Sequence, residues 1–388
     1  MKQWTDNRGN RPGMIAFPMH GQHKLTSEGY RTRDGHLIQW LGRLLEEAGP
    51  VSVVSRPEPI IAPGRAAFAE SSLAYNTIAY PTRTKRLPLS LDRQRWWVTS
   101  LGAYPPIPDA LRGCDAIVWN PFVSLSASWE SLSQSPRRIV VDLLDDWSLH
   151  YAFRGISTQV EEAYRRLFAR ADHVMANSED TADLAKRFGR KDVELILNGC
   201  DPEIFRTENA ATGPTTIGYV GKIGKRLDLD LMVKTITSLP NAQFTFAGPI
   251  MDREYRQPLE SLPNVTLLGD VHYSDVPDLL TTFDVGWVPH RVGPGEVGGD
   301  VIKTYEYRAA GLPVVSTSVL GARSRRLDEH VYVSDARDHA DLIRLLADDG
   351  PRVPRRLADL PESVTWKFKA NQILDMLSRG TTISLEAR

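Results

Sequence analysis

Short apolar runs alternate with longer amphipathic patterns along this chain, and this alternation constrains the fold more than any other feature. Parallel strands need a crossover between them, and a helix is the usual crossover. The pattern therefore predicts parallel sheets with helices on both faces. In the first half we expect strands at residues 14–19, 51–56, 115–120, 138–144, 173–177 and 193–197, and helices at residues 36–48 and 158–170.

The alternation stops near residue 205 and starts again at Thr216. Residues 206–214 have no apolar period, so we expect a linker there, between a first domain at 1–205 and a second domain at 215–360. A last amphipathic helix is expected within residues 361–388. Two doubly wound sheets joined in this way would form a cleft between the carboxyl ends of their strands. The strands expected in the second half are 216–221, 243–248, 264–269, 285–290 and 313–318.

Composition sets the limits of this reading. A chain of 388 residues exceeds one ordinary core, and its net charge of -1 argues against a surface built for polyanions, so nucleic acid is not expected as a partner. Cys114 and Cys200 are the only cysteines, which fits a reducing cytoplasm without a disulfide framework. The polar N-terminus lacks the apolar core of a signal peptide, and no segment is long and apolar enough to cross a bilayer. We expect a cytoplasmic protein.

A turn rich in glycine and lysine, GKIGKR at residues 221–226, follows the first strand of the second half. Gly221 lets the backbone approach a ligand, the next helix offers free N-H groups, and the three basic residues add positive charge. A pyrophosphate would suit this turn. The alternative is a solvated surface turn, because glycine and lysine often follow a strand. The basic residues are Lys222, Lys225 and Arg226.

A glycine-rich loop at residues 293–300 leads into a helix that carries Lys303 and Glu306 on one face. Backbone N-H groups at Gly298 and Gly299, together with the helix dipole, favour an anion at this helix start. A carboxylate such as that of Glu306 can accept hydrogen bonds from both hydroxyls of a ribose. The alternative is an ordinary exposed ion pair between Lys303 and Glu306, which would contribute little.

Six stretches of the chain resemble GT-B glycosyltransferases, particularly glycosyltransferase family 4 and related bacterial exopolysaccharide enzymes. The resemblance implies two Rossmann-like domains facing a central cleft, with the C-terminal helix crossing back onto the first domain. It also implies an enzyme that uses a nucleotide-diphosphate sugar without a metal or other cofactor. The stretches are DLLDDWS (142–148), ADHVMANSEDTADLAKRFG (171–189), LILNGCDPEIF (195–205), GYVGKIGKRLDLDLM (218–232), LPNVTLLGDVHYSDVPDLLTTFDVGWVPH (262–290) and DVIKTYEYRAAGLPVVST (300–317).

Carried over by residue, the resemblance makes Glu306 the ribose ligand, and Lys222 with Lys225 or Arg226 the ligands of the diphosphate. The sequence departs from the family pattern at Gly298. Many family 4 enzymes have a glutamate at this position, eight residues before the ribose glutamate.

Two neighbours of Gly298 are acidic, Glu296 and Asp300. Either could replace the missing glutamate, or backbone N-H groups alone could hold the donor sugar. The identity of the sugar is open for this reason.

Asp145 and Asp146 directly follow the expected strand at 138–144 and should lie at the predicted cleft. A carboxylate there could deprotonate an attacking hydroxyl, giving inversion, or orient the acceptor in a retaining reaction. One of the two could instead cap the next helix. We favour Asp145 as the chemical residue. The resemblance to family 4 favours retention, while the paired aspartates leave inversion open.

The polar segment from His20 to His36 follows the first strand and should face the donor phosphates and the acceptor. A mobile, solvated connection would explain most of its charges equally well. His20 and His23 form no convincing metal set with nearby acids or cysteines, so no metal is expected from them. The acceptor candidates in this segment are Arg31, Arg33, Asp34 and His36.

A basic segment with two tryptophans lies at Arg83 to Trp97. It could bind an anionic lipid surface or a phosphate-bearing acceptor, with the indoles at the interface, or contact nucleic acid by stacking. A solvated basic face is the more common meaning of such a run. No helix or strand can be assigned within residues 57–104. Residues 57–112 lie outside the resemblance, and we expect this region to meet the acceptor.

The function predicted from these observations is sugar transfer from a nucleotide-diphosphate donor to a hydroxyl acceptor. Two other functions remain open. A nucleotide-sugar epimerase of similar fold would bind the same donor but would not need an acceptor region such as residues 57–104. A non-catalytic partner of the same fold would lose its ligands, and Gly298 is consistent with that loss.

Overall fold

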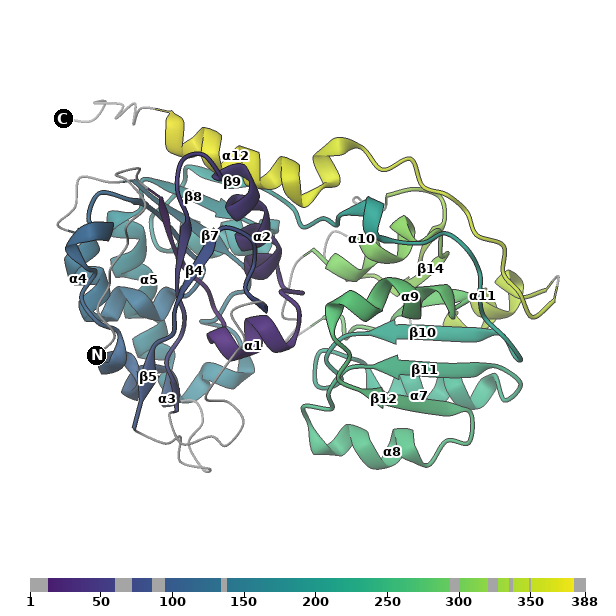
Figure 1. Cartoon of the computed structure of the whole chain (residues 1–388). Coiled ribbons are helices and arrows are strands. Elements are labelled where there is room, and N and C mark those ends of the chain that lie inside the picture. The colour runs from purple at the N-terminus through teal and green to yellow at the C-terminus, as the bar shows by residue number, and fades with distance from the viewer. Residues whose placement is uncertain are drawn as a thin grey trace.

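The chain folds into two α/β domains in the computed structural model (Figure 1). Residues 206–215 join them and contain no helix or strand. The expected GT-B architecture is confirmed, whereas the domain limits drawn from the sequence stay predictions. The structure describes residues 13–59, 72–85, 95–133, 138–293, 300–319, 327–334, 338–348 and 350–379.

The first domain contains a seven-stranded parallel sheet in the order β4-β2-β1-β6-β7-β8-β9. Strands β1, β2 and β7 are buried along their whole length, as expected for a sheet covered on both faces. The strands are β1 (Met14–Phe17), β2 (Val51–Val54), β4 (Thr77–Tyr80), β6 (Asp115–Val118), β7 (Ile139–Leu143), β8 (His173–Ala176) and β9 (Val193–Leu195). The helices are α1 (Gln22–Ser27), α2 (Arg33–Leu44), α3 (Trp96–Thr99), α4 (Ala127–Ser133), α5 (Ser157–Arg170) and α6 (Glu179–Arg187).

The second domain contains a six-stranded parallel sheet in the order β12-β11-β10-β13-β14-β15. The strand order reverses at β10 here and at β1 in the first domain, and such switch points are where open α/β sheets bind ligands. The strands are β10 (Thr216–Val220), β11 (Gln243–Ala247), β12 (Val265–Gly269), β13 (Val285–Val288), β14 (Val314–Thr317) and β15 (Val331–Ser334). The helices are α7 (Leu229–Ser238), α8 (Arg256–Glu260), α9 (Val276–Thr281), α10 (Ile302–Ala309) and α11 (His339–Leu346). One more helix, α12 (Trp366–Ser378), follows this domain in sequence.

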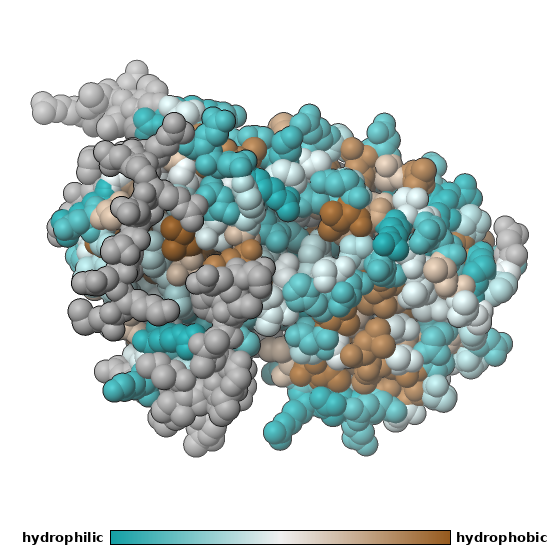
Figure 2. All heavy atoms as spheres, viewed as in Figure 1, coloured by the Kyte–Doolittle hydropathy of each residue, from teal (hydrophilic) through white to brown (hydrophobic). Residues whose placement is uncertain are grey.

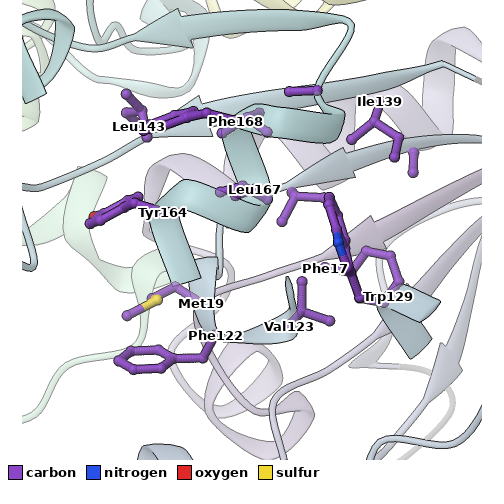
Figure 3. Close-up of a cluster of buried hydrophobic side chains, with 14 of the residues drawn as sticks. Phe17, Met19, Phe122, Val123, Trp129, Ile139, Leu143, Tyr164, Leu167 and Phe168 are labelled. Atoms are coloured by element: carbon purple, nitrogen blue, oxygen red, sulfur yellow. The ribbon is translucent and has the colours of Figure 1, made fainter. Parts of the chain in front are cut away.

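Helix α5 shows how the amphipathic pattern becomes a core. Its buried residues recur at helical spacing and so share one face, which packs onto the first sheet. Figure 3 shows part of this core, where side chains of α5 gather with Phe17 of β1 and Leu143 of β7. The buried residues of α5 are Val160, Ala163, Tyr164, Leu167 and Phe168.

Helix α12 belongs to the first domain by its packing, although it follows the second domain in sequence. Trp366, Ala370 and Ile373 are fully buried in the same cluster as α2 and β7 residues. Figure 1 shows this helix, in yellow, lying along the first domain beside α2. The Trp366 ring stacks on His36 with centroids 5.0 Å apart. The predicted return of the C-terminal helix is therefore confirmed.

The segment before α2 differs from the expected polar loop. Residues 22–27 form α1, and α2 begins at Arg33 and ends at Leu44, not at 36 and 48. The chain reverses between the helices through Gly29 and Tyr30, which have φ angles of 70° and 59°. A Cβ on Gly35 would lie 2.3 Å from the Tyr30 carbonyl oxygen, so this glycine lets α2 pack against the turn.

The described part of residues 57–104, to which no elements were assigned, contains three short strands and an α-helix. They are β3 (Glu58–Pro59), β5 (Arg83–Thr84), β4 and α3, and β3 pairs with β5 in a small parallel sheet. Residues 86–94 of the basic segment lie outside the described residues, and membrane contact there stays a prediction. Its two tryptophans do not present their indoles to an outer surface, because Trp96 is 7% exposed and Trp97 faces the cleft.

The face seen in Figure 2 is largely hydrophilic, with hydrophobic side chains gathered over the lower part of the second domain. The edge strand β12 is partly exposed along its length, and Leu268 on it is 46% exposed. Among the described residues, no helix has the length and apolar character required to span a membrane.

We predict that Trp366→Ala destabilises the first domain. Removing the buried indole leaves a large cavity and abolishes the stacking on His36. Such truncations lower the free energy of unfolding by about 3 to 5 kcal/mol. Urea unfolding followed by circular dichroism measures the loss. Lys367→Ala, at an exposed position of the same helix, is the matched control. Equal stability of the two variants would contradict the structural role given to α12.

Candidate functional site

A cavity of about 540 Å³ lies between the two domains, at the carboxyl ends of both sheets. The segments after β1, β2 and β7 line it from the first domain. The turn after β10 and the face of α10 line it from the second. Both topological switch points therefore open onto one space, as the sequence predicted for the cleft.

The turn after β10 lies so close to the turn after β11 that glycine is needed where the two backbones meet. Gly221 has a φ of 144°, and a Cβ on Gly248 would lie 1.9 Å from the Gly221 carbonyl oxygen. Lys222 follows and reaches the solvent of the cavity, yet the cavity walls desolvate it and Lys24 repels its charge. These effects lower the pKa of Lys222 to about 7. An anion bound here would restore the charged form.

The other two basic residues of this turn differ in their surroundings. Lys225 lines the cavity and lies 3.8 Å from Glu254 in a half-exposed pair. Arg226 extends across the cavity to the first domain, where its Nη2 donates to Oδ2 of Asp145 at 2.8 Å. All three basic residues of the turn thus face the space between the domains.

Lys303 and Glu306 are not an exposed ion pair. Glu306 is 6% exposed and its Oε1 accepts a hydrogen bond from the Tyr273 hydroxyl at 2.9 Å. Burial raises the pKa of Glu306 to about 7, although Tyr273 and Lys303 favour its charged form. Burial likewise lowers the pKa of Lys303 to about 8, and its Nζ lies 5.1 Å from the centre of the Tyr219 ring. Both side chains line the cavity.

The glycine-rich loop before α10 is only partly described. Gly298, Gly299 and Glu296 lie outside the described residues, and their predicted roles stay predictions. Asp300 points away from the cavity, since its Oδ2 accepts from the Asn198 N-H at 2.6 Å and from the Tyr305 hydroxyl at 2.7 Å. These contacts speak against Asp300 as a substitute for the acid missing at Gly298.

Asp145 and Asp146 have different structural roles. Asp145 lines the cavity and pairs with Arg226. Asp146 stabilises the turn that follows β7, because its carboxylate accepts from the Ser148 N-H at 3.0 Å and pairs with Arg187. Asp146 thus caps a turn and not, as expected, the next helix, and the chemical role of Asp145 stays a prediction.

The acceptor candidates at the start of α2 and just before it mostly make structural contacts. Arg31 bonds Glu28 at 3.0 Å and Asp270 of the second domain at 2.9 Å. Arg33 is 3% exposed and holds Asp142 at 2.8 Å. Both arginines still contribute to the cavity wall. This segment of the first domain is therefore ordered, and Arg31 joins it to the second domain. The interpretation of these charges as part of a mobile, solvated loop is wrong.

His36 is placed away from the cavity lining. Its ring is 1% exposed and packs between Trp366 and the edge of Tyr273, whose centroid lies 4.8 Å away. Burial lowers the pKa of His36 to about 3, so the ring is neutral. These contacts indicate that it packs the seam between the domains, and they speak against direct contact with an acceptor.

Sequence reasoning missed His20 as a cavity residue. Its Nδ1 lies 3.2 Å from Asp34, which is fully buried and also accepts from the Met19 N-H at 3.0 Å. Burial alone would raise the pKa of Asp34, but His20 and the hydrogen bonds outweigh it and lower this pKa to about 2. The carboxylate therefore stays ionised and orients the imidazole. Asp34 is a positioning residue, not an acceptor ligand.

His150 is a second cavity residue that the sequence did not single out. It is 8% exposed, and burial together with Arg226 lowers its pKa to about 4. The only available signal was position, since His20 and His150 follow strands β1 and β7. Among the described residues no group of histidine, cysteine and acidic side chains could hold a metal ion.

We predict that Glu306 makes stability depend on pH. Because its pKa is raised on folding, the folded state binds more protons than the unfolded state between about pH 4.5 and 7. Wild type should therefore lose stability relative to Glu306→Gln as pH rises through this window, by up to about 3 kcal/mol. Urea unfolding at pH 5, 6 and 7 measures the difference. Glu254→Gln, at an exposed carboxylate of the same domain, is the control, and parallel curves for all three proteins would refute the shift.

Comparisons with known proteins agree with this architecture. The family model "Glycosyltransferase Family 4" matches residues 37–204, and the model "Glycosyl transferases group 1" matches residues 214–349. The protein named "Putative teichuronic acid biosynthesis glycosyltransferase TuaH", from Bacillus subtilis, is 25% identical over 239 residues. That match covers 56% of this chain and 58% of the relative.

Solved glycosyltransferase structures share the fold at low identity. A UDP-forming trehalose-phosphate synthase from Burkholderia xenovorans superposes with a TM-score of 0.61 at 12% identity, covering 95% of this chain and 99% of the other. The lipopolysaccharide outer core galactosyltransferase WaaB gives 0.53 at 13% identity, covering 95% of this chain and 100% of the other. With one family model on each domain and this fold, the chain belongs to the GT-B glycosyltransferases of the family 4 type.

Proposed function

We propose that this protein transfers a sugar from a nucleotide-diphosphate donor to a hydroxyl acceptor. One arrangement supports the proposal above all. The basic turn after β10 and the buried Glu306 lie on one wall of the cavity, and Asp145 of the other domain lies across it, paired with Arg226. A donor and an acceptor bound to opposite walls would meet between them.

The second domain would bind the donor. Lys222, with Lys225 or Arg226, would contact the diphosphate. Its negative charge would offset the desolvation and the repulsion by Lys24 that lower the pKa of Lys222. Glu306 would accept hydrogen bonds from the ribose hydroxyls in place of the one it accepts from Tyr273. Binding at pH 7 then requires Glu306 to ionise, which nearby Lys303 favours.

In the transfer step, the acceptor oxygen bonds to the anomeric carbon of the sugar. The bond from that carbon to the diphosphate oxygen breaks, and the nucleoside diphosphate leaves with the electron pair. Lys222 and Arg226 would stabilise the charge that develops on it. The acceptor proton goes to Asp145 in an inverting reaction or to the departing phosphate oxygen in a retaining one. His20, oriented by Asp34, is a second proton acceptor at the cavity.

We predict that a nucleoside diphosphate raises the melting temperature of the wild type and that Glu306→Ala weakens this response. Without the carboxylate that accepts hydrogen bonds from the ribose, the affinity for the nucleoside diphosphate should fall on the order of tenfold. Differential scanning fluorimetry with UDP, GDP and ADP, followed by calorimetric titration of the one that binds, measures the effect. Glu260→Ala is the control, at an exposed site of the same domain that lies outside the cavity lining. If none of the three binds the wild type, the donor proposal fails; if Glu306→Ala binds equally well, only the ribose role fails.

We predict that Asp145→Asn and Asp146→Asn have different consequences. The first should lower transfer at least about a hundredfold if the reaction inverts, because it then removes the proton acceptor, and by less if the departing phosphate takes the proton. Nucleotide affinity should be kept or increased by the release of Arg226. The second should keep more of the activity than the first, because the Asp146 side chain is not part of the cavity lining and acts only by holding the turn that carries Trp147 and His150. Release of nucleoside diphosphate in the presence of acceptor measures turnover. Near-normal turnover of Asp145→Asn would leave His20 as the residue to test.

A further inference from the structure

A hydrogen bond from Tyr273 occupies the carboxylate that would bind the ribose. The Tyr273 hydroxyl donates to Oε1 of Glu306 at 2.9 Å, and both side chains line the cavity. Glu306 is 6% exposed, so little of its carboxylate is open to a ligand while this bond persists. Phenol and ribose hydroxyls are the same kind of donor to a carboxylate, and they compete where they reach the same oxygen.

The first domain holds Tyr273 in this position. The backbone N-H of Tyr273 donates to the Glu28 carbonyl oxygen at 3.3 Å. Its ring meets the buried His36 ring edge to face, with centroids 4.8 Å apart. Glu28 and His36 both belong to the segment between β1 and β2 of the first domain. Turning the Tyr273 ring away from Glu306 therefore disturbs the packing between the two domains.

Two segments dock on each other beside this tyrosine. Residues 270–273 of the second domain meet residues 26–31 of the first, and we call this docking the seam contact. In it, Nη1 of Arg31 donates to Oδ1 of Asp270 at 2.9 Å and to the Val271 carbonyl oxygen at 3.2 Å. One guanidinium nitrogen thus binds both a side chain and the backbone of the docked segment.

A histidine completes the seam contact. Nδ1 of His272 accepts from the Ser274 N-H at 3.3 Å, so the proton of the neutral ring lies on Nε2. Nε2 then donates to the Thr26 carbonyl oxygen at 3.3 Å. A Cβ on Gly29 would lie 2.7 Å from Cε1 of His272, so this close approach requires glycine. Specific residues of both domains therefore shape the contact.

The hydrogen bond from Tyr273 lowers the affinity for a ribose that needs the same carboxylate. A protein that binds a ligand in only one of two states has its affinity reduced by the fraction of molecules in that state. The bond is charge-assisted when Glu306 is ionised, and such bonds shift an equilibrium by about tenfold or more. The seam contact adds to the effect because it keeps the tyrosine in place.

We propose that Tyr273 is an internal competitor of the donor ribose for Glu306, held in place by the seam contact. The proposal rests on the proposed function, because it concerns the carboxylate that would bind the ribose. Donor binding replaces the phenol hydroxyl by a ribose hydroxyl and loosens the docking of residues 270–273. The tyrosine thereby links occupancy of the donor site to the contact between the domains.

Tyr273→Phe tests the competition, because it removes the hydroxyl and keeps the ring that packs on His36. Calorimetric titration with UDP, GDP and ADP compares the variant with the wild type at pH 6 and pH 9. The pKa of Glu306 is about 7, so the carboxylate is ionised at pH 9, and there the variant should bind nucleotide about tenfold more tightly. Burial and Glu306 raise the pKa of Tyr273 well above its usual value, so the wild-type hydroxyl still donates at pH 9.

At pH 6 the two proteins should bind nucleotide about equally. Glu306 is then protonated in both before the ligand arrives, so neither protein gives up a charge-assisted hydrogen bond, and both release the same proton on binding. The other charged or titratable groups that face this carboxylate belong to Lys303, Arg31 and Cys200, and they act alike in both proteins. The ratio of the two affinities at each pH therefore reports the hydroxyl alone.

Further variants locate the effect. In a Glu306→Ala background, Tyr273→Phe should give no gain, because the contested carboxylate is absent. Asp270→Asn weakens the seam contact and should raise the affinity at pH 9 by less than Tyr273→Phe, since the hydroxyl remains. Asp275→Asn, at an exposed position outside the cavity lining, is the matched control and should bind as the wild type does.

Three results would count against these roles, and each has a different meaning. Equal or weaker binding by Tyr273→Phe at pH 9 would overturn the competition, because truncating a tyrosine that only orients Glu306 weakens binding. Binding by Asp270→Asn no tighter than by Asp275→Asn would overturn the role of the seam contact. If no nucleotide binds either the wild type or Tyr273→Phe, the donor proposal itself fails and the competition fails with it.

Discussion

The buried ion pair between Arg33 and Asp142 holds together the elements on which the cleft depends. Its Nε–Oδ2 distance is 2.8 Å, and both side chains are almost fully buried, so removal of either partner would leave an uncompensated charge in the interior. Arg33 also donates to Asn198, and Asn198 in turn bonds Asp300 at the start of α10. A continuous polar chain therefore runs from the first sheet to the helix that carries Glu306. The spacing of the two walls is set by this chain and by the return of α12.

Burial at this seam explains the unusual charges of the cavity. Glu306 and Lys303 belong to α10, which is packed close to the first domain, and desolvation moves the pKa of each towards its neutral form. Lys222 shows the same trend, because the cavity walls desolvate it and Lys24 repels its charge. The empty site is electrostatically unfavourable for its own residues. A bound diphosphate and ribose would relieve these costs, which is a physical reason for selective binding of a nucleotide.

The sequence predicted the order of elements well because apolar period and glycine-bounded turns are local signals. It also led to Glu306, Lys222 and Asp145, which the structure brings to one cavity, through a resemblance concentrated in short motifs. It says less where a residue's role depends on distant partners. Arg33 and His36 were expected to contact the acceptor from their place in the chain, but the residues they pack against, Asp142 and Trp366, lie far along the sequence. His20 and the Tyr273–Glu306 contact were missed for the same reason.

The contact between Asp145 and Arg226 has a consequence for the timing of events in the cleft. The guanidinium of Arg226 donates a hydrogen bond to the carboxylate of Asp145. Under the proposed roles, a diphosphate that claims the arginine also releases the aspartate, so the group that receives the acceptor's proton becomes available only after the donor has arrived. Binding would then follow a fixed sequence, donor before acceptor. The same contact would keep Asp145 from accepting a proton while no donor is bound.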